Sequence, residues 1–219
     1  MEKGQGHDLS MLYTIAHLLI YPLARICFRL KVVGVEYIPL GGGAIIAANH
    51  MSYLDIPLLG CALKRRADFV GKAELFKNPV VSFLFRRLGG FPIKREGIDR
   101  LAIEEAVRRL RAGRLVVFYP EGRRSEDGLL QQPKPGIGMV AAKAKVPIIP
   151  ALIEGTGEVL PKRSKRLRFH PVIIKFGPPL DTMQFAEAER GKRGKLYYTK
   201  ISQAAMAGIQ KLKNGDACA

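Results

Sequence analysis

Short apolar runs alternate along the chain with longer segments in which apolar residues recur every three or four positions. The short runs favour β-strands, whereas the longer spacing favours amphipathic helices. We therefore predict strands at 31–35, 44–48, 68–71, 91–94, 115–119, 148–153 and 172–176. This alternation predicts one α/β domain over residues 31–219, with a mixed central sheet flanked by helices.

Two helices are expected between these strands and a third after the last of them. Segment 98–112 shows the clearest helical spacing, and Gly113 follows it as a stop signal. Segment 79–88 begins with Pro79, which suits a first helical turn, and ends at a Gly-Gly pair. Segment 195–212 is expected to close the fold, because Ile201, Ala205 and Ile209 lie on one side of it.

Residues 1–30 form a separate N-terminal segment. Residues 11–30 are mostly apolar, but the uncharged stretch between Asp8 and Arg25 falls short of the ~20 apolar residues that a membrane span needs. Acidic residues precede it and no small-residue cleavage site follows, which argues against a signal peptide. We predict an amphipathic helix at the membrane interface, with Arg25, Arg29 and Lys31 facing headgroups. The alternative is a helix packed on the core.

The net charge of the chain indicates which kinds of molecule it can bind. The chain of 219 residues has 36 Lys and Arg against 19 Asp and Glu, a net charge of +17, which attracts nucleic acid, anionic lipid or phosphorylated substrates. A mean hydropathy of +0.03 favours a membrane surface. No basic stripe interleaved with aromatic residues and no nucleic-acid motif is visible, so nucleic acid is not an expected partner. The basic segment 161–168 fits either a solvated loop or a contact with anionic lipid.

Three cysteines without metal-ligand spacing indicate neither a disulfide framework nor a metal site, and a reducing cytosolic environment is expected. We therefore expect the protein on the cytoplasmic face of the cell membrane, without a metal or other cofactor.

The segment NHMSYLD (49–55) follows an apolar strand and precedes an apolar run. His50 is expected just past the strand end and Asp55 in the first turn of the next helix, where the carboxylate can return to the imidazole. An Asp bound to one ring nitrogen leaves the other free to accept a proton. The alternative is structural, because Ser52-x-x-Asp55 before an apolar run is also a capping-box variant with Ser52 as the N-cap.

Three further segments have simple structural alternatives. The segment FYPEGRRS (118–125) places Arg123, Arg124 and Glu121 in one tight turn. The planar guanidinium groups of the arginines suit phosphate. Glu121 can accept a hydrogen bond from a substrate hydroxyl or hold an arginine in place. GGFPIKR (89–95) adds Lys94 and Arg95 after glycines that permit close backbone approach. VPIIP (146–150) is an apolar strand framed by prolines. Taken singly, these segments are a surface turn, a basic crossover and a core strand.

Together, in this order and spacing, the four segments resemble the glycerolipid acyltransferase family over residues 31–176. The closest resemblance is to the 1-acylglycerol-3-phosphate (lysophosphatidic acid) acyltransferases. It implies transfer of a fatty acyl group from acyl-CoA or acyl carrier protein to the hydroxyl of a lysophospholipid, giving phosphatidic acid, at an anionic membrane surface.

The resemblance also implies residue roles. His50 would be the general base and Asp55 would orient it. Acceptor glycerol and phosphate binding is expected from Glu121, Gly122, Arg123, Arg124, Arg95 and Lys94. The acyl donor or acyl-chain pocket is expected at Val146, Pro147, Ile148 and Pro150.

The chain departs from the family pattern at three positions. Arg123 stands where threonine is usual, and Pro92 and Lys94 replace residues that are more often apolar and acidic. These departures leave open another acceptor, such as glycerol 3-phosphate, a different lysophospholipid or an amino-acid lipid. A non-enzymatic basic protein that binds membrane or nucleic acid is the alternative from a different functional class.

Overall fold

The computed structural model describes residues 5–94, 99–164, 166–188 and 194–215. Its described strands form a seven-stranded sheet in the order β1-β7-β6-β2-β5-β3-β4. Neighbouring strands are parallel except for β6 and β7, so the predicted mixed sheet is confirmed. The strands are β1 (Lys31–Val33), β2 (Ala44–Ala48), β3 (Ala67–Lys72), β4 (Phe91–Ile93), β5 (Leu115–Phe118), β6 (Ile148–Glu154) and β7 (Ile173–Phe176).

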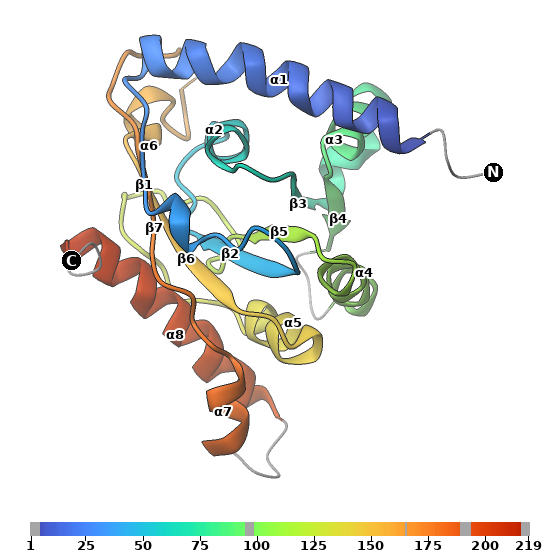
Figure 1. Cartoon of the computed structure of the whole chain (residues 1–219). Coiled ribbons are helices and arrows are strands. Elements are labelled where there is room, and N and C mark those ends of the chain that lie inside the picture. The colour runs from blue at the N-terminus through green and yellow to red at the C-terminus, as the bar shows by residue number, and fades with distance from the viewer. Residues whose placement is uncertain (1–4, 95–98, 165, 189–193, 216–219) are drawn as a thin grey trace.

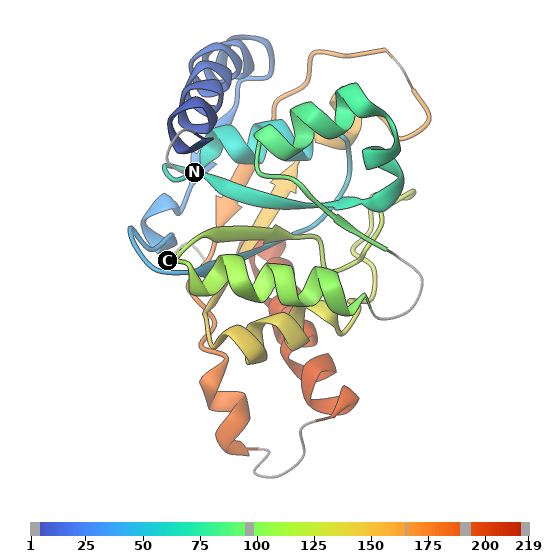
Figure 2. The ribbon, with the colours of Figure 1, turned by 90° about the vertical axis from the view of Figure 1, so that its right-hand side faces the viewer.

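Helices cover both faces of the sheet (Figures 1 and 2). One face carries α1 (Gln5–Cys27), α2 (Asp55–Ala62) and α3 (Pro79–Arg87), and the other carries α4 (Arg100–Arg111), α5 (Gly136–Ala144) and α8 (Lys195–Asn214). The shorter elements are α6 (Thr156–Val159), α7 (Met183–Ala188) and the 3-10 turns η1 (Val35–Tyr37) and η2 (Ala73–Lys77).

The central strands are buried on both sides. In β2, Ile45 and Ala47 pack against the layer of α4, α5 and α8. Ala44, Ile46 and Ala48 pack against the layer of α1 and α2. Because successive strand residues point to opposite faces, burial on both faces requires the unbroken apolar run seen in the sequence. Because β2, β5 and β3 are parallel neighbours, their carboxyl ends lie at the same edge of the sheet, where α/β folds place their sites.

Helix α5 was not among the predicted elements. Its sequence, GIGMVAAKA, contains two glycines, which are poor helix formers. A glycine is required at position 138, because a Cβ there would lie 2.0 Å from the Tyr198 carbonyl oxygen of α8. The close approach of two helices therefore overrides the local helix propensity.

Helix α1 shares features with both N-terminal alternatives. Ala24 is buried in the core layer beside α2. Among the α1 residues whose side chains are described, five large apolar ones are exposed, namely Ile15, Leu18, Leu19, Leu23 and Ile26. Within the described residues, no helix combines the length and the hydrophobicity of a membrane-spanning segment.

Candidate active site

His50 lies in the loop after the carboxyl end of β2, and Asp55 is the first residue of α2. His50 Nδ1 lies 2.7 Å from Asp55 Oδ2, and both residues are buried. Because the carboxylate accepts the hydrogen bond from Nδ1, the Nε2 lone pair is left to accept a proton from a substrate. This arrangement can serve as a general base with an orienting carboxylate.

Asp55 also fixes the backbone of the turn that holds His50. Its Oδ2 accepts the N–H groups of Met51 at 2.7 Å and Ser52 at 2.9 Å. Its Oδ1 accepts the hydroxyl hydrogen of Thr156 at 2.6 Å. The catalytic and structural interpretations of Asp55 therefore do not exclude each other.

The structural alternative, with Ser52 as the N-cap of α2, is wrong about the cap residue. Helix α2 begins at Asp55 with Leu54 in the N-cap position and no side-chain cap. The Ser52 hydroxyl instead donates to the Leu160 carbonyl at 2.9 Å, so it ties the loop to the end of α6.

Hydrogen bonds hold the His50 loop against the end of β6 and against the segment that follows β5. The Asn49 side chain pairs with both backbone groups of Ile153, at 2.9 Å to the carbonyl and 2.7 Å to the N–H. The Ser125 N–H donates to the His50 carbonyl at 2.8 Å. The segments following β2 and β5 and the end of β6 are thus joined around the imidazole.

Glu121 accepts a hydrogen bond from the backbone of His50. Its Oε1 accepts the His50 backbone N–H at 3.1 Å, and its Oε2 accepts the Gln131 N–H at 3.0 Å. Burial raises the pKa of the Glu121 carboxyl, and these two hydrogen bonds oppose the rise. Glu121 is 3% exposed and is not among the cavity-lining residues. Its described contacts therefore position the backbone of His50.

Tyr119 packs directly on the imidazole. The two ring centroids lie 4.1 Å apart with an interplanar angle of 20°. Burial, and secondarily the charge of Asp55, raises the pKa of the Tyr119 hydroxyl well above its ordinary value. That hydroxyl is buried without a hydrogen-bond partner among the described residues. The ring thus restricts the imidazole, while the hydroxyl adds an unpaired polar group.

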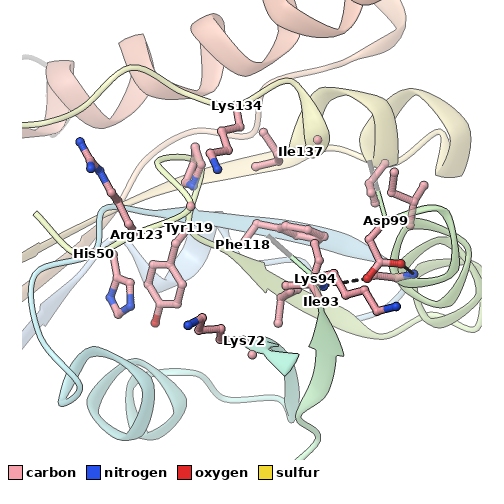
Figure 3. Close-up of a pocket in the computed structure, with 18 of the residues that line it drawn as sticks. His50, Lys72, Ile93, Lys94, Asp99, Phe118, Tyr119, Arg123, Lys134 and Ile137 are labelled. Carbon is pink, nitrogen blue, oxygen red and sulfur yellow. Dashed lines mark hydrogen bonds between the residues drawn. The ribbon is translucent and has the colours of Figure 1, made fainter. Parts of the chain in front are cut away.

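His50 opens onto a cavity of about 640 Å³ (Figure 3). Much of its wall is apolar and comes from β3, β4, β5, α4 and α5, including Val70, Phe91, Ile103, Phe118, Ile137 and Val140. Seven lysines and arginines also line it, namely Lys72, Lys94, Arg123, Arg124, Lys134, Lys162 and Lys195. A cavity with these two kinds of wall suits a ligand that has an apolar chain and anionic groups.

The arginine segment lies at this cavity, as its sequence suggested. Gly122 adopts a φ of +72°, and a Cβ there would lie 3.0 Å from the Lys134 side chain, so glycine fits both the turn and the crowding. The Arg124 guanidinium lies over the Tyr53 ring, 3.7 Å from its centroid. Lys162, from the basic segment 161–168, donates to the Arg124 carbonyl at 3.2 Å. At least this lysine of the basic segment therefore belongs to the site.

The other expected binding residues are placed differently. Lys94 lines the cavity, whereas Arg95 lies outside the described residues. Val146, Pro147, Ile148 and Pro150 are not among the cavity-lining residues. Ile148 belongs to the core layer beside α5 and α8, and Pro150 packs on Gly177 and Gly208. The structure does not bring these four residues together with the cavity at His50.

Sequence reasoning missed several site residues. Thr156 and Asn49 act through contacts 101 and 104 residues apart in sequence, which no local pattern reports. Tyr53 lies inside the His50–Asp55 segment and, as an aromatic residue near two arginines, carried a signal for a cation–π contact. Lys72 and Lys134 carried no local signal.

The comparisons with known proteins agree with this geometry. The family model described as Acyltransferase matches residues 29–154, more than half of the chain and including both members of the His50–Asp55 pair. The chain belongs to the acyltransferase family. The resemblance drawn from the four sequence segments is therefore confirmed at the level of the family.

Named relatives of this acyltransferase include enzymes of glycerolipid synthesis. A chloroplast 1-acyl-sn-glycerol-3-phosphate acyltransferase of Arabidopsis thaliana is 32% identical over 75% of the chain and 45% of its own length. A Bacillus subtilis protein of the same name is 29% identical over 84% of the chain and 88% of its own length. An Arabidopsis thaliana N-acylphosphatidylethanolamine synthase is 32% identical over 58% of the chain and 50% of its own length. The chain spans slightly less than half of the plant acylglycerol-phosphate acyltransferases that it matches.

A solved structure supports the fold over nearly the whole chain. The acyltransferase resembles the 1-acyl-sn-glycerophosphate acyltransferase PlsC of Thermotoga maritima with a TM-score of 0.73 and 28% sequence identity. The match covers 97% of this chain and 82% of that one.

Proposed function

We propose that the protein transfers a fatty acyl group from a thioester donor to the free hydroxyl of 1-acyl-sn-glycerol 3-phosphate, giving phosphatidic acid. The donor is acyl-CoA or acyl carrier protein. One observation carries the proposal: the buried His50–Asp55 pair, 2.7 Å apart, opens onto a cavity with an extensive apolar wall and several cations. The names of the relatives give the acceptor class.

In the proposed reaction, His50 Nε2 removes the proton of the acceptor hydroxyl as the hydroxyl oxygen attacks the thioester carbonyl carbon. The C–S bond then breaks, and the imidazolium returns the proton to the departing thiolate. Asp55 stabilises the imidazolium, on which the Tyr119 ring also stacks. Proton removal by a positioned His typically contributes 10²–10⁴-fold, and holding hydroxyl and thioester together supplies much of the rest. The thioester is already activated, so this route needs no cofactor.

The cavity wall supports a placement for each part of the substrates. Arg123 and Arg124 would bind the acceptor phosphate, because planar guanidinium groups suit phosphate oxygens. An acyl chain would lie along the apolar wall that includes Phe91, Phe118 and Ile137. The remaining lysines of the cavity would meet the phosphates of CoA or an acidic carrier protein.

A membrane location follows from the same proposal. The exposed apolar side chains Leu18, Leu19, Leu23 and Ile26 of α1 lie near Arg25 and Arg29 in sequence. An amphipathic helix of this kind binds in the plane of a bilayer interface. We place this contact on the cytoplasmic face of the cell membrane, where anionic lipids attract basic segments.

The proposal is tested with purified protein in detergent or liposomes, an acyl-CoA or acyl carrier protein donor, and a panel of acceptors. We expect transfer to lysophosphatidic acid to exceed transfer to glycerol 3-phosphate, lysophosphatidylcholine and lysophosphatidylethanolamine. A preference for another acceptor would overturn the assignment of the substrate, though not of the reaction. Salt-sensitive nucleic-acid binding without acyl transfer by the folded protein would overturn both.

A further inference from the structure

Helix α3 exposes apolar side chains on its outer face. Val80 is 74% exposed, Val81 41%, Phe83 59% and Leu84 53%. We call these four residues the α3 patch. Val80, Phe83 and Leu84 follow the spacing that places residues on one side of a helix. The start of the helix is fixed, because Asn78 Oδ1 accepts the N–H groups of Val80 and Val81 at 3.0 and 3.1 Å.

On the inner side of α3, Phe85 packs against the rest of the fold. Phe85 packs so closely on the backbone of β3 and of the segment before β4 that a Cβ at Gly71 or Gly90 would lie 2.5 or 2.0 Å from its ring. Its ring also meets Phe76 edge-on, with centroids 5.5 Å apart. Because Phe85 provides the attachment to the fold, the α3 patch is left for another partner.

Helix α4 shows the ordinary arrangement for comparison. Its buried side consists of Ala102, Ile103, Ala106, Val107 and Leu110. Its exposed positions include charged residues such as Glu104 and Arg108, with Leu101 as an isolated apolar side chain, 79% exposed. Isolated exposed apolar residues are common on protein surfaces, whereas a group of them marks an interaction site.

Cations border the α3 patch. The Arg87 guanidinium lies over the Phe83 ring, 4.8 Å from its centroid, and the Arg86 guanidinium lies over Phe76 at 5.0 Å. Lys77 ends the preceding turn η2, and the sequence of α3 contains no acidic residue. An apolar patch edged by arginines complements an anionic lipid surface, with side chains among the acyl chains and guanidinium groups at the phosphates.

The location of α3 agrees with this partner. Figures 1 and 2 place α1 and α3 on the same side of the molecule, with α4, α5 and α8 on the opposite side of the sheet. Leu75 of η2, just before α3, lines the cavity at His50. A bilayer that contacts both helices would therefore lie close to one wall of the cavity.

We propose that the α3 patch is a second membrane-binding element, which inserts into an anionic bilayer beside α1 and holds one wall of the cavity against the lipid. The choice of lipid as partner rests on the proposed function, but vesicle binding can be measured without acyl transfer. The His50→Ala variant should therefore bind vesicles as the unaltered protein does, so that failure of each proposal is separately visible.

The first test uses the absence of tryptophan from the chain. Phe83→Trp places a single fluorophore in the α3 patch, and Leu101→Trp places one on α4 as a matched control. With vesicles containing phosphatidylglycerol, we expect a blue shift and quenching by brominated lipid for Phe83→Trp and neither for Leu101→Trp. A tryptophan at position 83 that stays in water while the protein is bound to vesicles would overturn the proposal.

The second test measures affinity by vesicle co-sedimentation. The double variant Phe83→Asp, Leu84→Asp should bind these vesicles at least about tenfold more weakly, whereas Leu101→Asp should stay within about twofold. If the double variant does not fold, Arg86→Gln with Arg87→Gln should still weaken binding to anionic vesicles. Unchanged vesicle binding together with loss of a dimer in sedimentation velocity would instead make the α3 patch a contact between copies of the chain.

Discussion

The variant Asp55→Asn separates the charge of Asp55 from its hydrogen bonds. The carboxylate Oδ2 accepts bonds from His50 Nδ1 and from the backbone of Met51 and Ser52. An asparagine oxygen can occupy that position, and its amide can donate to the Thr156 hydroxyl, which now lies 2.6 Å from Oδ1. The turn should therefore be preserved while the negative charge beside the imidazole is lost.

The distance sets the size of the expected effect. With Nδ1 and Oδ2 2.7 Å apart, an imidazolium–carboxylate attraction at an effective dielectric constant of about 20 is about 4–6 kcal/mol. Losing it from the transition state corresponds to a fall in kcat of about 10³-fold to 10⁴-fold. The assay is steady-state acyl transfer, with thermal unfolding of the same samples.

Thr156→Val is the matched control. It removes one hydrogen bond to the same buried carboxylate, which should cost about 1.5–3 kcal/mol of stability, but it leaves the charge in place, so kcat should fall less than about tenfold. A charge effect of Asp55 on the transfer is ruled out if Asp55→Asn lowers kcat no more than Thr156→Val does. Asp55 would then serve the turn alone.

Four other changes test acceptor binding, the packing of Tyr119 and the ion pairs of Glu105 in α4. Arg124→Ala should raise KM for the phosphorylated acceptor about 10-fold to 100-fold with little change in kcat. Tyr53→Leu should raise the same KM about two- to fivefold, because it removes the ring on which Arg124 stacks. An unchanged KM in either variant would contradict the role given to that residue. Tyr119→Phe should raise the free energy of unfolding by about 1 kcal/mol, because it removes a buried hydroxyl without a described partner; a large loss of kcat instead would give that hydroxyl a catalytic role. Hydrogen bonding to Arg108 and Arg109 lowers the pKa of Glu105 to about 2, so its stabilising contribution is present above pH ~4.5 and is lost as the pH falls towards 2. Urea unfolding of Glu105→Gln should show a smaller loss of stability over that range than the unaltered protein, and identical pH profiles would disprove the linkage.

The strands could be predicted because their signal is local. Each predicted apolar run lies on a strand of the sheet, and its ends differ from those of the strand by at most two residues. Helix α5 escaped prediction because Gly138, one of its two glycines, serves a contact with α8 that only the folded chain creates. Helix α2 was anticipated from Asp55 and the apolar run that follows it, although the cap residue is Leu54 and not Ser52.

The site shows the same division between local and distant information. The His50–Asp55 pair lies within five residues, so its spacing could be interpreted directly. Glu121 contacts the His50 backbone across 71 residues, and the sequence offered no means of choosing that partner. The cavity wall comes from several strands and helices, so the VPIIP segment (146–150), although suitably apolar, carried no information about where it lies.

We propose that His50 is the general base of an acyl transfer to a lysophospholipid hydroxyl. The most direct test compares transfer by the unaltered protein and His50→Ala, with lysophosphatidic acid and a long-chain acyl-CoA in liposomes. We expect His50→Ala to fold and bind vesicles normally and to lose transfer by at least about 10²–10⁴-fold, the usual contribution of a positioned base. Transfer by a folded His50→Ala protein at close to the unaltered rate would contradict the claim.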